Sequence, residues 1–224
     1  ALRGLGHRVT VVSPLYKGID PTARSLARRL STLNVEVLGK NYACQLYDGR
    51  TTGGVDLLFL GNAELFAEHT PGSGDSDTRL RSALLLSAAA AQLASTRDPK
   101  PEVLHARGAG AAAAIPLAKQ LRPELGCALS IVDGEDPLLV PAAHLSELFV
   151  PEALRSAVLP AEPSLLSAGV RSADAVLTSS AGSSQRLGDP AHSALAASLR
   201  EKGGRFMSVV NGVNELESDW FKQN

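Results

Sequence analysis

The sequence is poor in the residues that mark several classes of protein. Among its 224 residues are two cysteines, one tryptophan and one methionine, and aromatic residues make up only 4%. Cys44 and Cys127 lie far apart and neither belongs to a Cys-x-x-Cys pair, which argues against a disulfide scaffold and against a thiolate metal site. Such sparse cysteine is typical of proteins in a reducing compartment, so we expect a cytoplasmic protein.

An excess of charge of one sign is also missing. Lys and Arg number 22 and Asp and Glu 23, which gives a formal net charge of −1. A nucleic-acid-binding domain usually has a basic surface, and a membrane-surface helix has a basic amphipathic pattern. The longest apolar run, residues 83–94, is interrupted by Ser87 and Gln92 and is too short to span a bilayer. We therefore expect neither a nucleic-acid partner nor a membrane segment.

The chain does have enough apolar residues, 44%, to bury one full core. After residue 100, short apolar runs alternate with helical segments. The predicted strands are 102–105, 127–132, 175–178 and 206–210, and the predicted helices are 108–121, 164–172, 180–187 and 190–202. Strands that alternate with helices are typical of right-handed crossovers and of a parallel sheet flanked by helices. The fold class predicted is α/β, with a Rossmann-like parallel sheet.

The first hundred residues add a central strand, an insert and a long helix. The β-branched run at 9–12 predicts a strand buried on both faces. Further strands at 35–38, 43–47 and 55–60 are separated by glycine turns, which indicates a small β-hairpin insert. An alanine- and leucine-rich helix should span 77–97, capped by Asp75, Ser76 or Asp77. We expect the strands at 9–12, 102–105, 127–131, 175–177 and 206–210 to lie parallel in one sheet.

The first residues resemble the end of a helix followed by a strand. Gly6 has the position of a glycine that ends a helix, and a strand should follow at 8–13. We therefore expect that the polypeptide begins upstream of Ala1.

In a parallel sheet, ligands bind at the carboxyl ends of the strands. One of these ends is followed by Gly108-Ala109-Gly110-Ala111-Ala112-Ala113, which matches the dinucleotide-binding pattern G-x-G-x-x-A, and Asp133 ends the next strand. A dinucleotide-dependent oxidoreductase is therefore one hypothesis. The alternative is that glycine and alanine simply let this helix lie close to the sheet.

Six segments in order resemble one enzyme family. They are LGHRVTVVSPLY at 5–16, DLLFL with ELF at 56–66, DTRLRSAL at 77–84, PEVLHA at 101–106, ADAVLTSS at 173–180 and VNGVN at 210–214. Together they resemble bacterial glycogen synthases and plant starch synthases, which form glycosyltransferase family 5 and have the GT-B fold. The resemblance implies that residues 1–224 form a single N-terminal GT-B domain, without the C-terminal nucleotide-binding domain. It also implies transfer of glucose from ADP-glucose to an α-1,4-glucan, with no metal or other cofactor.

Among the polar residues of that family, His105 is retained, whereas several others are replaced in this chain. Its phosphate loop, K-T-G-G-L, would lie before Ala1. Where the family has H-A-H-D-W, this chain has His105-Ala106-Arg107-Gly108-Ala109. The histidine near the reacting sugar corresponds to Val132, which cannot donate a side-chain hydrogen bond or titrate, and the aromatic residue that stacks on the glucan corresponds to Asp136. The resemblance therefore implies a degraded active site, and we assign no catalytic residue.

Four polar residues remain as candidate ligand-binding groups: His105, Arg107, Asp133 and Ser180. Arg107 beside a helix start would suit an anion, although arginine at a strand end is more often ion-paired or solvated. His105 could bind a sugar hydroxyl or phosphate, or simply a backbone group. Ser180 is equally suited to cap a helix. Asp133 belongs to an acidic triplet with Glu135 and Asp136, for which a solvated loop is favoured over a metal site.

Two functions follow from these observations. The favoured hypothesis is a starch-synthase-like domain that is inactive alone and serves as a binding or scaffold module, with a glucan or sugar nucleotide as a possible ligand. The alternative is one half of an active ADP-glucose:1,4-α-glucan glucosyltransferase. Trp220 and Phe221 follow the last predicted strand, where they would contact a second domain or a protein partner.

Overall fold

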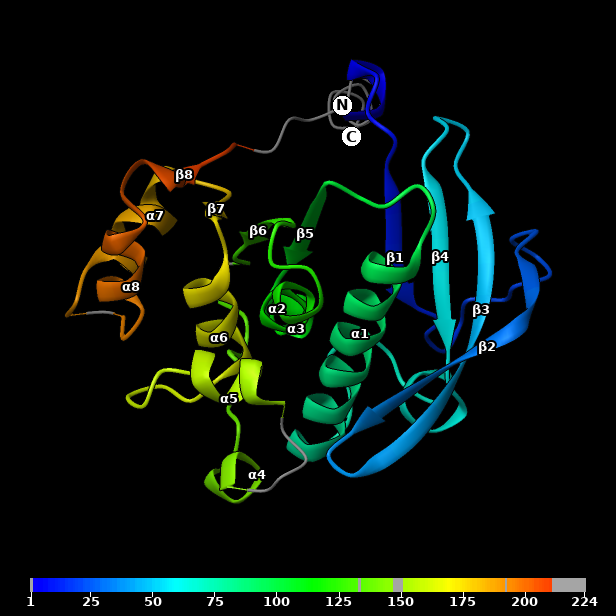
Figure 1. Cartoon of the computed structure of the whole chain (residues 1–224), viewed down its shortest axis with the longest axis horizontal. Helices are drawn as coiled ribbons and strands as arrows, with labels where there is room; N and C mark the ends of the chain where they lie inside the picture. The colour runs from blue at the N-terminus through cyan, green and yellow to red at the C-terminus, as the bar shows by residue number, and fades with distance from the viewer. Residues whose placement is uncertain (1, 133, 147–150, 192, 211–224) are drawn as a thin grey trace, which may run out of the picture.

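The described strands form two four-stranded sheets. The structure is a computed structural model, and it describes residues 2–132, 134–146, 151–191 and 193–210. The first sheet has the order β1-β4-β3-β2 and the second has the order β5-β6-β7-β8 (Figure 1). Both sheets contribute to the same hydrophobic core.

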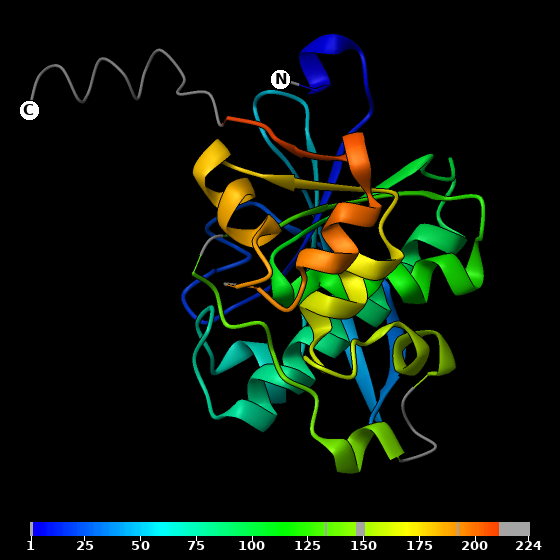
Figure 2. The ribbon, with the colours of Figure 1, turned by 90° about the vertical axis from the view of Figure 1, so that its left-hand side faces the viewer.

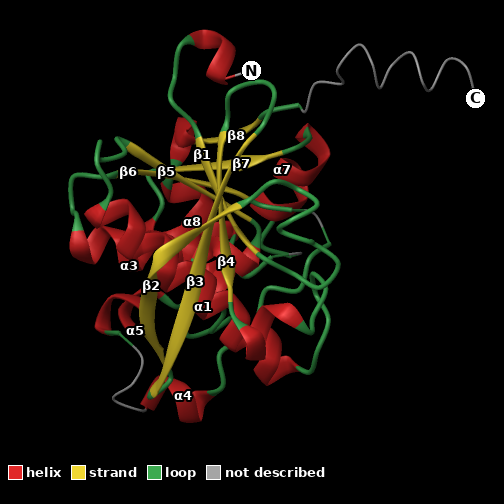
Figure 3. Ribbon diagram, turned by 90° about the vertical axis from the view of Figure 1, so that its right-hand side faces the viewer, coloured by secondary structure: helices red, strands yellow, loops and turns green. Residues whose placement is uncertain are grey.

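The first sheet is mixed. Strand β1 (Thr10–Pro14) pairs in parallel with β4 (Asp56–Gly61), whereas β3 (Lys40–Arg50) is antiparallel to both β4 and β2 (Ala27–Val37). Strands β2 and β3 form the predicted hairpin, which is longer than expected and extends well beyond the rest of the sheet (Figure 3). Its turn lies at Leu38 and Gly39, which both have positive φ, as a type I′ hairpin turn requires.

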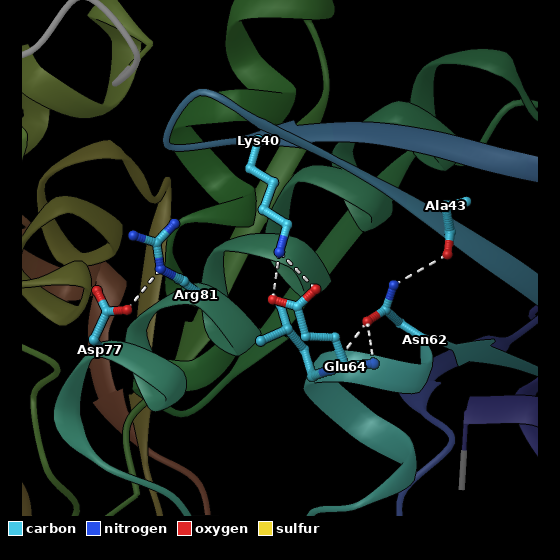
Figure 4. A network of polar contacts seen from close by, with 7 residues as sticks. Lys40, Ala43, Asn62, Glu64, Asp77 and Arg81 are labelled. Atoms are coloured by element: carbon cyan, nitrogen blue, oxygen red, sulfur yellow. Dashed lines mark hydrogen bonds and ion pairs between the residues drawn. The ribbon is translucent and has the colours of Figure 1, made fainter.

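A short π-helix, η2 (Ala63–Ala67), is tied to this hairpin (Figure 4). The Asn62 side chain accepts hydrogen bonds from two backbone N–H groups of the helix and donates to the carbonyl of Ala43 on β3, at 3.1 Å. The Lys40 ammonium lies 2.6 Å from a carboxylate oxygen of Glu64. These contacts fix the hairpin to the chain that leads into the central helix.

The second sheet is entirely parallel. It consists of β5 (Val103–Arg107), β6 (Gly126–Ser130), β7 (Ala175–Thr178) and β8 (Phe206–Ser208). The α/β prediction is thus confirmed, but the prediction of one sheet is wrong for residues 9–12. That segment is β1, which pairs with β4 in the other sheet, and Val11 is 45% exposed rather than buried on both faces.

The long helix α1 (Ser76–Thr96) connects the two sheets. Asp75 caps it by accepting a hydrogen bond from the N–H of Thr78, at 2.8 Å. The helix packs against β2 on one side and against α2 and α3 on the other (Figures 1 and 2). Its buried leucine and alanine side chains therefore belong to the core that both sheets share.

The shorter helices differ from prediction in their ends. The helix expected at 108–121 is two helices, α2 (Ala109–Ala112) and α3 (Ala114–Leu121), which puts Pro116 in the first turn of α3, where no N–H is needed. Helices α6 (Leu165–Ser172) and α7 (Ala181–Gly188) agree with prediction.

Other segments are shorter than expected. The helix expected at 190–202 shrinks to α8 (Ala196–Glu201). The irregular stretch between β6 and α6 includes the short helices α4 (Ala142–Ser146) and α5 (Glu152–Ala157). The chain starts with a 3-10 helix, η1 (Leu2–Leu5), followed by Gly6 at φ +90°.

Each sheet contains one buried, free cysteine, Cys44 on β3 and Cys127 on β6. Burial raises the pKa of each thiol to about 11. Within the described residues, no helix is both long and apolar enough to cross a membrane.

Candidate ligand-binding edge

The carboxyl ends of β5, β6 and β7 lie along one edge of the parallel sheet. Two candidate residues and a serine lie at this edge. His105 and Arg107 are on β5, and Ser130 ends β6. The Nε2 atom of His105 lies 2.8 Å from the Ser130 hydroxyl oxygen. Partial burial and the nearby Arg107 charge lower the pKa of His105. This shift favours the neutral imidazole, which can exchange hydrogen bonds with a hydroxyl group.

The space beside the start of α2 is filled by a carboxylate of the chain itself. Glu135 accepts a hydrogen bond from the N–H of Val132, at 3.2 Å from Oε1, and its carboxylate lies close enough to the N–H of Ala109, the first residue of α2, for that group to lower its pKa. Gly108 has φ +73°, and a Cβ at this position would lie 2.6 Å from Oε2 of Glu135. The backbone conformation thus favours glycine here, and a side chain at this position would also make the Glu135 carboxylate move.

This arrangement corrects the expectation of a solvated acidic loop at Glu135, which is half-buried, whereas Asp136 is exposed as expected. Burial raises the pKa of Glu135, whereas the two backbone N–H groups and the Arg107 charge lower it. Asp136 is also engaged, because its carboxylate lies 2.8 Å from the guanidinium of Arg79 on α1. The third acidic residue, Asp133, lies outside the described residues. In the part of the chain that the structure describes, no group of three His, Cys, Asp or Glu side chains could hold a metal ion.

Ser180 lies at the end of β7, two strands from His105 in the sheet order. Its hydroxyl oxygen accepts a hydrogen bond from the N–H of Ser183, at 3.1 Å, and lies 2.9 Å from the Ser183 hydroxyl. The capping interpretation is confirmed: Ser180 is the N-cap of α7. Its side chain therefore already has partners within the chain.

The structure thus brings His105 and Arg107 together, and it leaves Ser180 at a separate strand end. Trp220 and Phe221 lie outside the described residues. Sequence reasoning missed the role of Glu135. No local signal marks it, because the contact joins an acidic residue after one parallel strand to the helix start that follows the neighbouring strand.

Residues 1–201 match the family model of the starch synthase catalytic domain. The chain belongs to this family. A segment of 114 residues is 36% identical to Glycogen synthase 1 of Geobacter sulfurreducens and covers 47% of this chain and 22% of that protein. The fold is similar to the catalytic domain of starch synthase IV from Arabidopsis thaliana, which was solved bound to ADP and acarbose, with a TM-score of 0.81 and 18% sequence identity. That likeness covers 97% of this chain and 46% of the other.

The fold is therefore one half of a GT-B fold, the half that carries the N-terminal domain of these glycosyltransferases. The chain spans less than half the length of either relative.

Proposed function

We propose that residues 1–224 are a starch-synthase-type domain that transfers no glucose by itself and serves as a binding or scaffold module. The observation that carries this proposal is the Glu135 carboxylate at the start of α2. A phosphate group approaching the N–H of Ala109 would meet this negative charge and would have to displace it. Val132, at the end of the next strand, offers no titratable side chain in its place.

A ligand at this edge would contact the polar groups that remain. His105 and Arg107 are the best placed for a sugar hydroxyl or a phosphate, and Ser180 and Asp133 would extend the site along the edge. The solved relative binds ADP and acarbose, so a nucleoside diphosphate and a glucan-like oligosaccharide are the ligand classes to test. A protein partner or second domain near Trp220 and Phe221 stays a prediction, as does a cytoplasmic location.

Glucosyl transfer is tested directly. Residues 1–224 are incubated with radiolabelled ADP-glucose and glycogen, beside a blank without protein and a heat-treated sample. We expect no incorporation above the blank. Incorporation that heating abolishes would overturn the proposal.

Ligand binding is tested separately by titration calorimetry with ADP, ADP-glucose and a maltooligosaccharide. We expect no binding heat with ADP or ADP-glucose, because Glu135 holds the helix start. Binding that weakens in Arg107→Ala, but not in the control Arg24→Ala with its exposed side chain, would show instead that a phosphate site persists.

The second candidate is half of an active ADP-glucose:1,4-α-glucan glucosyltransferase. Family membership and the similarity to a catalytic domain solved with ADP favour it. The same transfer assay on the complete reading frame decides between the two, since a second domain with a basic diphosphate site would restore activity. The oxidoreductase hypothesis gains no support, because the helix after Gly108 begins against a carboxylate rather than an open anion site.

A further inference from the structure

Residues 134–138, which we call the acidic turn, are held in shape by their own carboxylates. Oε1 of Glu135 accepts a hydrogen bond from the N–H of Val132, and Oδ1 of Asp136 accepts one from the N–H of Leu138, at 2.9 Å. Leu138 has φ +57°, in the left-handed region where the Cβ of a leucine meets steric strain. The bond to Asp136 therefore helps to stabilise a backbone conformation that leucine itself disfavours.

A residue of the long helix contacts the acidic turn from the side. Arg79 lies near the start of α1, and its Nη1 atom is 2.8 Å from Oδ2 of Asp136. The Arg79 side chain is 32% exposed and the Asp136 side chain 44% exposed. The Nε atom of Arg79 is buried and has no hydrogen-bond partner among the described residues. The bond to Asp136 thus offsets part of the cost of burying this guanidinium.

Asp136 therefore makes two contacts through one carboxylate. Its Oδ1 atom faces the N–H of Leu138 inside the acidic turn, and its Oδ2 atom faces Arg79 on α1. Because Glu135 is the preceding residue, the placement of Asp136 determines where the Glu135 side chain leaves the backbone. The end of the acidic turn is also joined to the start of α6 by two backbone hydrogen bonds. Arg79 adds a support on the side that faces α1.

We propose that Arg79 is a positioning residue, which holds Asp136 and thereby keeps the Glu135 carboxylate at the start of α2. Loss of the Arg79 cation would leave Asp136 without its partner on α1 and would loosen the acidic turn. Glu135 would then move away from Val132 and Ala109 and leave the start of α2 open. The inference rests on the proposed function only in that Glu135 is taken as the group that excludes an anion.

Hydrogen exchange at the amide of Val132 tests the positioning directly, because this N–H donates to Glu135. Arg79→Gln removes the charge and keeps most of the length of the side chain. We expect it to raise the exchange rate of this amide about 10-fold or more, and Arg79→Lys to restore slow exchange. The matched control is Arg81→Gln, since Arg81 pairs with Asp77 of the same helix (Figure 4). It should leave the exchange rate at Val132 unchanged.

Two results of the exchange experiment would overturn the inference. One is an exchange rate at Val132 that is the same in Arg79→Gln, Arg81→Gln and the unaltered chain. The other is an equal rise in Arg79→Gln at the amide of Leu129, in the middle of β6, since that would show a loss of fold stability rather than the release of one side chain.

A variant on the other side of the contact provides a second test. Asp136→Asn removes the charge and keeps an oxygen for the N–H of Leu138. Because Arg79→Gln and Asp136→Asn remove the same ion pair, the double variant should exchange at Val132 no faster than the faster single variant. Additive effects in the double variant would contradict the inference.

The titration of Glu135 gives an independent readout. Burial raises its pKa, and Asp136 raises it further, whereas Arg107 on β5 and the N–H groups of Ala109 and Val132 lower it. Release into solvent removes the effect of burial, so the NMR midpoint of the Glu135 carboxyl carbon should fall in Arg79→Gln and stay in place in Arg81→Gln. Loss of a positive charge alone would move the midpoint upward. An unchanged or raised midpoint would therefore overturn the inference.

Calorimetry with ADP separates this inference from the proposed function. Both Arg79→Gln and Glu135→Ala should bind ADP measurably. Binding by Glu135→Ala but not by Arg79→Gln would overturn the positioning role. Fast exchange at Val132 in Arg79→Gln, with no ADP binding by either variant, would support the positioning role and contradict the exclusion of an anion by Glu135.

Discussion

The two ends of the parallel sheet use their polar side chains differently. At the amino end, Asp174 accepts hydrogen bonds from the Lys119 ammonium, at 2.9 Å, and from the N–H of Cys127, at 2.8 Å. Lys202 donates to the carbonyls of Arg171 and Ala173. Each of these contacts joins segments that are distant in the sequence, so this end fastens helices and strands to one another.

The carboxyl end has fewer ties of this kind. Ser180 bonds within its own helix cap, and the His105 ring has one hydroxyl partner. Glu135 accepts its hydrogen bond from the backbone N–H of Val132 rather than from a cation. From this comparison we expect substitutions at the amino end to lower the stability of the fold more than substitutions at the carboxyl end, although Arg79 and Asp136 also join distant segments there. That division is expected when ligands bind at the carboxyl ends of strands.

The largest predicted effect on stability is the loss of the Arg122 hydrogen bonds at the amino end of the parallel sheet. Arg122 donates to the carbonyls of Ala94 and Pro101, at 3.1 and 2.9 Å, and its side chain is only 14% exposed. Arg122→Ala leaves both carbonyls unpaired, and we expect the free energy of unfolding to fall by about 2–3 kcal/mol. Urea denaturation measures it, with Arg24→Ala as the control. Equal, small losses in both variants would break the comparison.

A smaller effect is predicted for Glu135 at the carboxyl end. Glu135→Ala frees the N–H of Ala109 and leaves the Arg107 charge without its carboxylate neighbour. We expect ADP to bind measurably to this variant by calorimetry, with a smaller change in the free energy of unfolding than for Arg122→Ala. If Glu135→Ala binds ADP no better than the unaltered chain, then Glu135 is not what excludes the anion.

The smallest predicted effect concerns the titration of His105. Its lowered pKa means that the folded state favours the neutral imidazole. His105 therefore contributes to the free energy of unfolding above the unfolded pKa of about 6.5, and this contribution is lost as pH falls through the folded pKa. NMR titration of the ring protons should give a midpoint below about 6.5, with His105→Gln to assign the signal.

Arg107→Ala removes the neighbouring positive charge and should move the His105 midpoint upward. Arg24→Ala should leave it in place. A midpoint that does not respond to Arg107→Ala would mean that burial alone sets the pKa, and that the two side chains do not form one site.

Local signals in the sequence were enough to predict much of the fold. The caps at Asp75 and Ser180, and the glycine turn of the hairpin, depend on neighbouring residues, and the structure confirms them. Which strand pairs with β1 depends on contacts between segments that are distant in the sequence. The hydrophobic pattern alone therefore could not show that β1 and β5 lie in different sheets.

The candidate site was harder to predict for the same reason. His105 and Arg107 are two residues apart on one strand, so their proximity follows from the sequence. The contact of Glu135 with Ala109 joins two different βα connections, and only the parallel pairing of β5 with β6 brings them together. An acidic loop residue therefore has no local signal that separates a solvated side chain from a bound one.

The two buried thiols can report on local opening of the structure. Cys44 lies in the first sheet and Cys127 in the second, and neither forms appreciable thiolate at neutral pH while folded, since burial raises each pKa to about 11. Because alkylating reagents attack the thiolate, each cysteine is labelled only when its own sheet opens. Mass spectrometry would follow the alkylation of the two cysteine-containing peptides over time. The two rates would then show whether the sheets open independently or together.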